Sequence, residues 1–313
     1  MSAGPWSDWI PGPARSGRPW VRLREDREGP LTAVVLFAVL AVVLVALDRL
    51  AVSMMRPRIR PPEVTPASVG LRARDWVIQG QPPLNGWWID GEDPGGPVVL
   101  VVHGWGANAG VTLPLARWAV PAASHVLTFD ARGHGRNSAV PQVNLRTFRD
   151  DVARAVEAVR EVAPRRPLVV LAHSMGGAGS ILAAADGAPI SGLLVVAAPY
   201  HLYDSIIGYL DDRGLPGRVL VPLVRPFWRL RVGLPERALH PGRAAERLRI
   251  PFRVLHPDQD TRVVPEEGEA LARAAGVERV AIAGAGHTDV LSRPEVGEEI
   301  VEFLRLVKQE SER

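Results

Sequence analysis

The sequence predicts an α/β protein built on a mostly parallel, doubly wound sheet that helices cover on both faces. Short runs of consecutive apolar residues, such as Val98–Val102 and Leu168–Leu171, are typical of strands buried on both faces. Stretches with apolar residues at helical spacing, such as Thr147–Val162, alternate with these runs. Alternating strands and helices along one chain predict this fold class.

The N-terminal part predicts a membrane anchor. Residues 1–30 are rich in glycine, proline, tryptophan and arginine without apolar periodicity, and we expect them to be disordered. Leu31–Leu47 is apolar apart from one threonine, and with the residues up to Val52 it reaches the length of a spanning helix. We therefore expect one transmembrane helix over residues 31–52. A cleaved signal peptide and a buried helix are the alternatives, but the run exceeds the usual signal-peptide core of about 7–15 residues.

The remaining chain divides into three parts. Residues 53–67 form a linker rich in proline and arginine, which we expect to be extended. Residues 68–308 form the folded domain, and residues 309–313 a short tail. Arginines stand on both sides of the anchor in near balance, so the positive-inside rule only slightly favours the domain outside a bacterial plasma membrane.

Two helix starts have capping signatures. Thr147 and Asp150 give a Thr-x-x-Asp pattern, which predicts that a helix begins at Thr147. Ser292-Arg293-Pro294-Glu295 predicts the start of a C-terminal helix in the same way.

Composition excludes several kinds of chemistry. The chain of 313 residues contains no cysteine, so disulfides, thiolate metal sites and cysteine nucleophiles are excluded. The formal net charge is only +3, and the arginines are scattered among acids, so we expect no nucleic-acid partner. Nothing in the sequence calls for a metal or an organic cofactor.

The pentapeptide Ala172-His173-Ser174-Met175-Gly176 is the most informative feature. It follows an apolar strand and precedes a stretch of small residues with helix character, Gly177–Ala185. A strand, a sharp turn with a serine and a helix form the context of a nucleophile elbow. Ala172 stands where the usual pattern has its first glycine. The pattern predicts that Ser174 is a nucleophile.

A serine nucleophile needs a base and a group that orients the base. Gly286-His287 follows a strand-like run near the C-terminus, and we expect His287 to be the base. Two acids, Asp258 and Asp260, follow the preceding strand and compete for the third role. Asp260 is favoured, with Asp258 as the alternative that caps the loop. The chain order is then serine, aspartate, histidine.

An oxyanion site is predicted after the strand Val98–Val102. This strand leads directly into His103-Gly104-Trp105-Gly106. Negative charge that develops on a carbonyl oxygen is stabilised by preorganised backbone N–H groups. We expect the amides of Trp105 and of Met175, the residue after the serine, to supply them. Because His103 and His134 lie in glycine-rich turns, we expect them to bond to the backbone.

The stretch Pro199–Ile250 stands where one helix is expected between the sixth and seventh strands. It mixes apolar residues with arginines, and we interpret the region about 200–250 as a helical lid that would also suit an anionic lipid surface. A packed structural insertion is the alternative.

Taken together, these segments resemble the α/β-hydrolase superfamily. The similarity covers roughly Val69–Val307, and within the superfamily the chain is similar to BEM46-like and serine-aminopeptidase-like (S33-type) members with a membrane anchor and a small lid. The resemblance implies hydrolysis of an ester, a thioester or an amide through a Ser174–His287–Asp260 triad, without metal or organic cofactor.

Several functions remain open. A small acyl ester, thioester or lipid is the favoured substrate, because the anchor places the site beside a membrane. An aminopeptidase would need a carboxylate cluster for the substrate ammonium, and Asp204, Asp211 and Asp212 are the candidates. A non-catalytic binding protein is a third hypothesis, although no triad member is missing. A dehalogenase is disfavoured, because that chemistry has an aspartate at the elbow.

Overall fold

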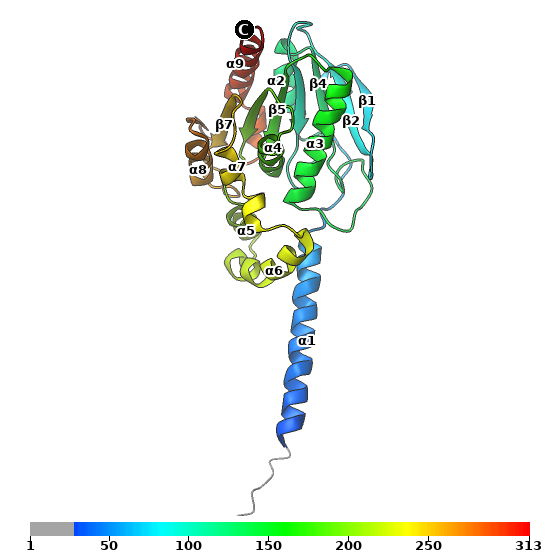
Figure 1. Cartoon of the computed structure of the whole chain (residues 1–313), viewed down its shortest axis with the longest axis vertical. Helices are drawn as coiled ribbons and strands as arrows, with labels where there is room; N and C mark the ends of the chain where they lie inside the picture. Colours follow the sequence, from blue (N-terminus) through cyan, green and yellow to red (C-terminus); the bar gives the residue numbers. More distant parts are fainter. Residues whose placement is uncertain (1–27) are drawn as a thin grey trace, which may run out of the picture. The chain divides into compact units, whose positions relative to one another are not determined.

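The computed structural model describes residues 28–313 and divides into two compact units, one ending at Val45 and the other comprising Ala46–Arg313 (Figure 1). Helix α1, Glu28–Met54, crosses this boundary. Its segment Leu31–Met54 is long and apolar enough to cross a membrane. Most of the N-terminal segment 1–30 lies outside the described residues.

The larger unit contains one sheet of eight strands in the order β1-β2-β4-β3-β5-β6-β7-β8. Strands β1 and β2 pair antiparallel, β2 also runs antiparallel to β4, and all other pairs are parallel. This confirms the predicted mostly parallel sheet. The strands are β1 Ala73–Ile78, β2 Leu84–Asp90, β3 Val98–Val102, β4 His125–Phe129, β5 Leu168–His173, β6 Gly192–Val196, β7 Phe252–Pro257 and β8 Arg279–Ile282.

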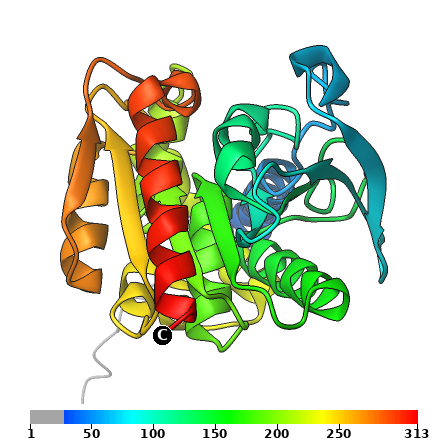
Figure 2. The ribbon, with the colours of Figure 1, turned by 90° about the horizontal axis from the view of Figure 1, so that it is seen from above.

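Two helical layers cover the sheet, and the period of a strand explains why both faces are apolar. In β3, Val98, Leu100 and Val102 pack into one core and Val99 and Val101 into the other. Helices α3, α4, α7 and α8 cover the first face, and α2 and α9 cover the second (Figure 2). Their bounds are α2 Leu113–Ala119, α3 Leu145–Val162, α4 Met175–Ala185, α7 Pro241–Ala245, α8 Pro265–Ala275 and α9 Pro294–Ser311, with short 3-10 helices at Ala67–Val69, Val120–Ala122, Glu236–Leu239 and Asp289–Ser292.

Both predicted helix starts need correction. Helix α3 begins two residues before Thr147, because Asn144 is the N-cap and forms a reciprocal capping box with Thr147. Thr147 is therefore the third residue of the helix. Helix α9 begins at Pro294 without a side-chain cap, and Ser292 ends the preceding 3-10 helix. At α3 a second residue close by, Asn144, satisfies the same capping rule, so the pattern alone selects the wrong one.

The insertion between β6 and β7 is helical, as predicted, and contains α5 Leu202–Asp211 and α6 Gly217–Val232 before α7. Helix α7 packs against α4 and α8, so this part of the predicted lid belongs to the helical layer. Helices α5 and α6 instead form a separate apolar cluster with Ala51 and Met55. The indole N–H of Trp228 on α6 donates to the carbonyl of Ala51 at 3.0 Å. The end of α1 is therefore part of the larger unit's packing.

Candidate active site

Ser174 lies in a strained turn between β5 and α4. Its φ is 53°, a conformation that side chains other than glycine rarely adopt. The Ser174 amide donates to the Val196 carbonyl at 2.9 Å, which holds the turn against the neighbouring strand. A Cβ atom added at Gly176 would lie 2.3 Å from the carbonyl oxygen of His103, so only glycine allows α4 to approach the loop after β3. This turn presents the serine hydroxyl at the carboxyl edge of the sheet.

His287 and Asp260 reach the same edge from the loops after β8 and β7. The Nε2 atom of His287 lies 3.0 Å from the Ser174 hydroxyl, and its Nδ1 atom lies 2.7 Å from Asp260 Oδ2. The carboxyl ends of parallel strands meet at one edge, which explains how residues more than one hundred positions apart come together. The three groups form a continuous chain of hydrogen bonds.

The structure brings Asp260, and not Asp258, to the histidine. Asp260 is 3% exposed, and its Oδ1 accepts the amides of Arg262 and Val263, each at 2.9 Å. Burial alone raises the pKa of Asp260, but the bonds from His287 and from these amides lower it more, so the net pKa is below its ordinary value. Asp258 is exposed and accepts the Gly284 amide at 2.8 Å.

Two buried histidines bond to the loops that carry the predicted triad residues, and the sequence analysis missed these contacts. His173 Nε2 lies 2.8 Å from the carbonyl oxygen of His287, and because a carbonyl only accepts, His173 donates this bond. Desolvation lowers the pKa of His173 to about 3, so the ring is neutral. His256 Nε2 bonds to the Val263 carbonyl at 2.8 Å and lies 3.8 Å from Asp260 Oδ2. A histidine beside the nucleophile was visible in the sequence, but its partner was not.

The amides of Trp105 and Met175 are the predicted oxyanion donors. Met175 is the first residue of α4, where helix N–H groups lack an intrahelical acceptor. Neither amide donates a hydrogen bond to any residue in the described range 28–313. A Cβ atom at Gly104 would lie 2.9 Å from the Ser174 Cβ, so the loop that carries Trp105 passes directly beside the serine. Both amides therefore belong to backbone segments that flank the Ser174 side chain.

Comparisons with known proteins find similar hydrolases. The family model described as serine aminopeptidase, S33 matches residues 95–216. A monoacylglycerol lipase of Mycolicibacterium smegmatis is 28% identical over 62% of this chain and 79% of its own length. Other curated relatives are matched over about half of their length or less.

Solved structures show the same fold. An esterase of Pyrococcus furiosus superposes with a TM-score of 0.63 at 20% identity, covering 80% of this chain and 96% of that one. A membrane phospholipase A, described as a bacterial virulence factor, gives 0.57 at 20% identity over 90% of this chain and 99% of that one.

The chain has the fold of these esterases, and the sequence matches support an α/β-hydrolase superfamily member. The predictions of this fold and of an α/β-hydrolase enzyme are therefore confirmed.

His103 and His134 bond to the backbone of the loops around the site, as predicted. His103 Nε2 accepts the Ala131 amide at 2.9 Å, and His134 Nε2 accepts the Gly106 amide at 3.1 Å. Burial lowers the pKa of His103 to about 4 and that of His134 to about 3. The buried carboxylate of Asp130 accepts the Ala109 amide at 2.7 Å and so ties two loops together.

The three lid acids do not form an open carboxylate cluster in this hydrolase. Asp204 accepts from His201 at 2.9 Å, and Asp211 accepts the Gly217 amide at 2.9 Å. Asp212 binds Arg262 Nε at 3.0 Å and Thr261 at 3.1 Å, next to the loop that carries Asp260. Each of the three carboxylates therefore has a hydrogen-bond partner within the described residues.

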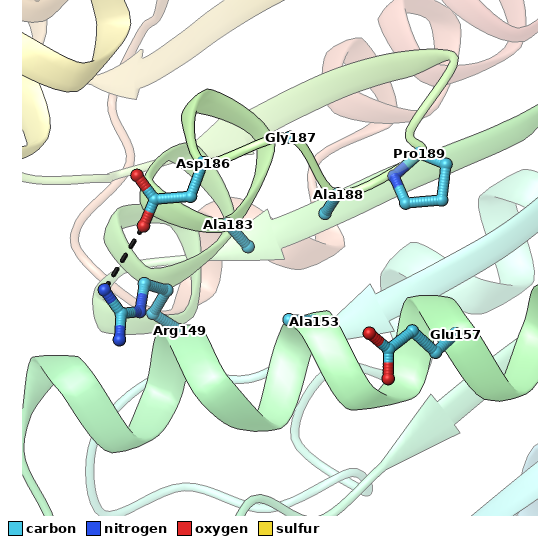
Figure 3. Close-up of a pocket in the computed structure, with 8 residues that line it drawn as sticks. All are labelled: Arg149, Ala153, Glu157, Ala183, Asp186, Gly187, Ala188 and Pro189. Atoms are coloured by element: carbon cyan, nitrogen blue, oxygen red, sulfur yellow. Dashed lines mark hydrogen bonds and ion pairs between the residues drawn. The ribbon is translucent and has the colours of Figure 1, made fainter.

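A pocket lies between α3 and the loop that follows α4, away from Ser174 (Figure 3). Arg149 and Asp186 form an ion pair of 3.2 Å at its edge. Ala183, the residue of α4 that lines this pocket, is separated from Ser174 by about 14 Å of helix rise. In residues 28–313, no group of three or more histidine, aspartate or glutamate side chains is arranged to hold a metal ion.

Proposed function

We propose that this chain is a membrane-anchored serine hydrolase that cleaves acyl esters through Ser174, His287 and Asp260. The observation that carries the proposal is the line of hydrogen bonds from the serine hydroxyl through both imidazole nitrogens to a buried carboxylate, at 3.0 Å and 2.7 Å. Hydroxyl, imidazole and carboxylate in this order form the arrangement that activates serine nucleophiles.

The reaction proceeds in two halves. The Ser174 oxygen attacks the ester carbonyl, and His287 Nε2 takes the hydroxyl proton. The amides of Trp105 and Met175 stabilise the oxyanion, each contributing about 2.7–4 kcal/mol. The tetrahedral intermediate then releases the alcohol, which takes the proton from His287 and leaves an acyl-serine. Water attacks this ester with His287 as base again, and the acid leaves as Ser174 regains its proton.

A lipid-derived acyl ester is the proposed substrate. A monoacylglycerol lipase, an esterase and a membrane phospholipase A are among the similar proteins. The long apolar α1 favours substrates that reside in or beside a bilayer. A panel of monoacylglycerols, short soluble esters and acyl thioesters tests this proposal. We expect the highest kcat/KM for an ester with a long acyl chain. A clear preference for acyl thioesters would contradict it.

An aminopeptidase is the second candidate, since the matching family model carries that description. The partnered state of Asp204, Asp211 and Asp212 argues against it. Parallel assays with aminoacyl anilides and acyl esters distinguish the two. Turnover of anilides that requires a free substrate amine would favour the peptidase.

The apolar helix is proposed to remain as a single-pass anchor. A signal peptidase cut after this helix would remove Ala51, which is fully buried against the lid, and the Asp48 partner of Arg231. The slight arginine bias favours the enzyme domain outside. Intact-mass measurement of the membrane-extracted protein tests retention of the helix, and protease accessibility in sealed vesicles tests the orientation.

Active-site labelling separates the enzyme from a non-catalytic binding protein. A fluorophosphonate reacts with an activated serine, so the full chain is expected to label and the Ser174→Ala variant is not. Ser180→Ala is the matched control and is expected to label, because the buried Ser180 hydroxyl bonds to the Gly176 carbonyl at 2.8 Å within α4. Labelling that survives in Ser174→Ala would overturn the assignment of the nucleophile.

A further inference from the structure

Helix α6 is apolar on two opposite faces. Its inner face packs against α5 and the end of α1 through the buried residues Val221, Val224 and Trp228. Its outer face repeats at helical spacing, and its large side chains are exposed at 58%, 47% and 81% in Val219, Leu223 and Leu230. Pro222 and Pro226 lie on the same outer side and are exposed. A solvent-facing helix normally carries polar residues there, so this face favours an apolar neighbour.

The charges of α6 favour an anionic neighbour. The helix contains four arginines and no acidic residue. Arg225 pairs with Glu236 and Arg231 with Asp48, so the charges of these two arginines are paired within the larger unit. Arg218 and Arg229 are exposed beside the apolar face. Arg229 Nε lies 3.6 Å from Glu236 Oε1, whereas Arg218 makes no ion pair with any residue in the described range. An exposed apolar face bordered by arginines is the pattern of a helix that lies in a membrane interface.

The contacts of the inner face join α6 to the end of α1 within the larger unit. Trp228 donates to the Ala51 carbonyl, and Arg231 pairs with Asp48. Asp48 is the first charged residue after the apolar run that begins at Leu31. Charged residues that end a spanning segment lie near the headgroups. If the proposed anchor spans the bilayer, α6 is therefore at the depth of the headgroups.

We propose that the outer face of α6 docks on the surface of an anionic phospholipid bilayer, with the end of α1 holding it there. This inference rests on the proposed membrane anchor and deepens the proposed function. Val219, Leu223 and Leu230 enter the region between headgroups and acyl chains, and Arg218 and Arg229 contact phosphate groups. The lid is then a fixed part of the membrane contact, and the enzyme draws its ester from the bilayer.

Because the chain contains no cysteine, single labels can report the depth of α6 directly. Leu223→Cys and Leu230→Cys in the full chain are labelled with an environment-sensitive fluorophore and reconstituted in vesicles of phosphatidylcholine and phosphatidylglycerol. Val162→Cys is the matched control, because Val162 is 57% exposed at the far end of α3. Both α6 labels are expected to shift to the blue and to be quenched by lipids with a nitroxide near the headgroup, while the control is not. Labels on α6 as water-exposed as the control would overturn the proposal.

Charge-removal variants test the anionic contact. The double variant Arg218→Gln/Arg229→Gln is compared with Arg243→Gln/Arg273→Gln, which removes the same charge from α7 and α8. Hydrolysis of monoacylglycerol in vesicles containing phosphatidylglycerol is expected to fall about fivefold or more only in the first pair. Hydrolysis of a short soluble ester is expected to be unchanged in both. Equal effects of the two pairs would contradict the proposal.

The outcomes separate this inference from the proposed function. Depth labelling does not depend on catalysis, so its result holds even if the ester assay shows no activity. Release of the protein from the vesicles would refute the anchor itself. Disulfide cross-linking of Leu230→Cys between two copies, without lipid quenching, would show that a second chain occupies this face and would overturn the inference.

Discussion

Replacing Asp260 by asparagine tests which carboxylate orients the proposed base. An asparagine can still accept the amides of Arg262 and Val263, so the loop is expected to keep its shape. Its NH₂ group would face His287 Nδ1, which must then accept. The proton moves to Nε2, and this atom no longer takes the Ser174 proton.

The expected loss of kcat follows from the loss of the correct His287 tautomer. In a triad of this type the loss of kcat is about 10⁴-fold, or about 5 kcal/mol of transition-state stabilisation. Asp258→Asn is the matched control in the same loop, since Asp258 is exposed and accepts only the Gly284 amide. It is expected to lose about 1 kcal/mol of stability or less and to retain kcat.

The assay is the hydrolysis of a soluble chromogenic ester by the full chain in detergent micelles, with fluorophosphonate labelling rates measured in parallel. Thermal unfolding of each variant shows that the fold persists. The reasoning fails if Asp260→Asn keeps kcat within tenfold of the unmodified chain, or if Asp258→Asn loses as much.

Three further predictions concern the groups around the triad. His173→Phe removes the donor to the carbonyl of the proposed base, and kcat is expected to fall about 10- to 100-fold with KM unchanged. His173→Gln restores a donor and is expected to recover part of kcat. An effect on KM alone would refute a positioning role. Gly176→Ala places a Cβ atom 2.3 Å from the His103 carbonyl and is expected to lower the free energy of unfolding by about 1–3 kcal/mol and to reduce activity. In Gly95→Ala the nearest neighbour of the new Cβ is the flexible end of a lysine, so this control is expected to keep its stability in denaturant titrations and its activity. His134 and His173 have pKa values lowered to about 3, so below pH 6.5 the unfolded chain binds protons that the folded chain does not. Stability present at pH 7 is therefore lost as the pH falls below about 6.5, by about 2 kcal/mol per ring at pH 5. A melting temperature that is flat from pH 7 to 5 would contradict this.

Much of the fold was predictable because its signals are local. The buried strands appear as continuous apolar runs such as Leu168–Leu171, and the helices appear as apolar residues at helical spacing. Element boundaries were less predictable. Asn144 and Thr147 both satisfy the preferences of a helix start, and the hydrogen bonds of α3 select Asn144.

The candidate site was predictable in part. Ser174 and His287 stand in recognisable contexts, and the structure brings them within hydrogen-bond distance of each other. Their catalytic roles, with those of Asp260, Trp105 and Met175, stay predictions that the variants above test. His173 and His256 were missed, because their partners lie on loops that are adjacent only in the folded sheet.

The sequence by itself determined the fold class, the order of serine, acid and histidine, the apolar N-terminal helix and the helical insertion. Each of these depends on residue types within a few positions or on their order along the chain. Only the tertiary structure brought Asp260, and not Asp258, into contact with His287, placed α7 in the helical layer and joined α6 to the end of α1. These outcomes depend on packing and hydrogen bonds between distant segments. Asp48 and Arg231, for example, are 183 residues apart, so no local pattern contains their contact.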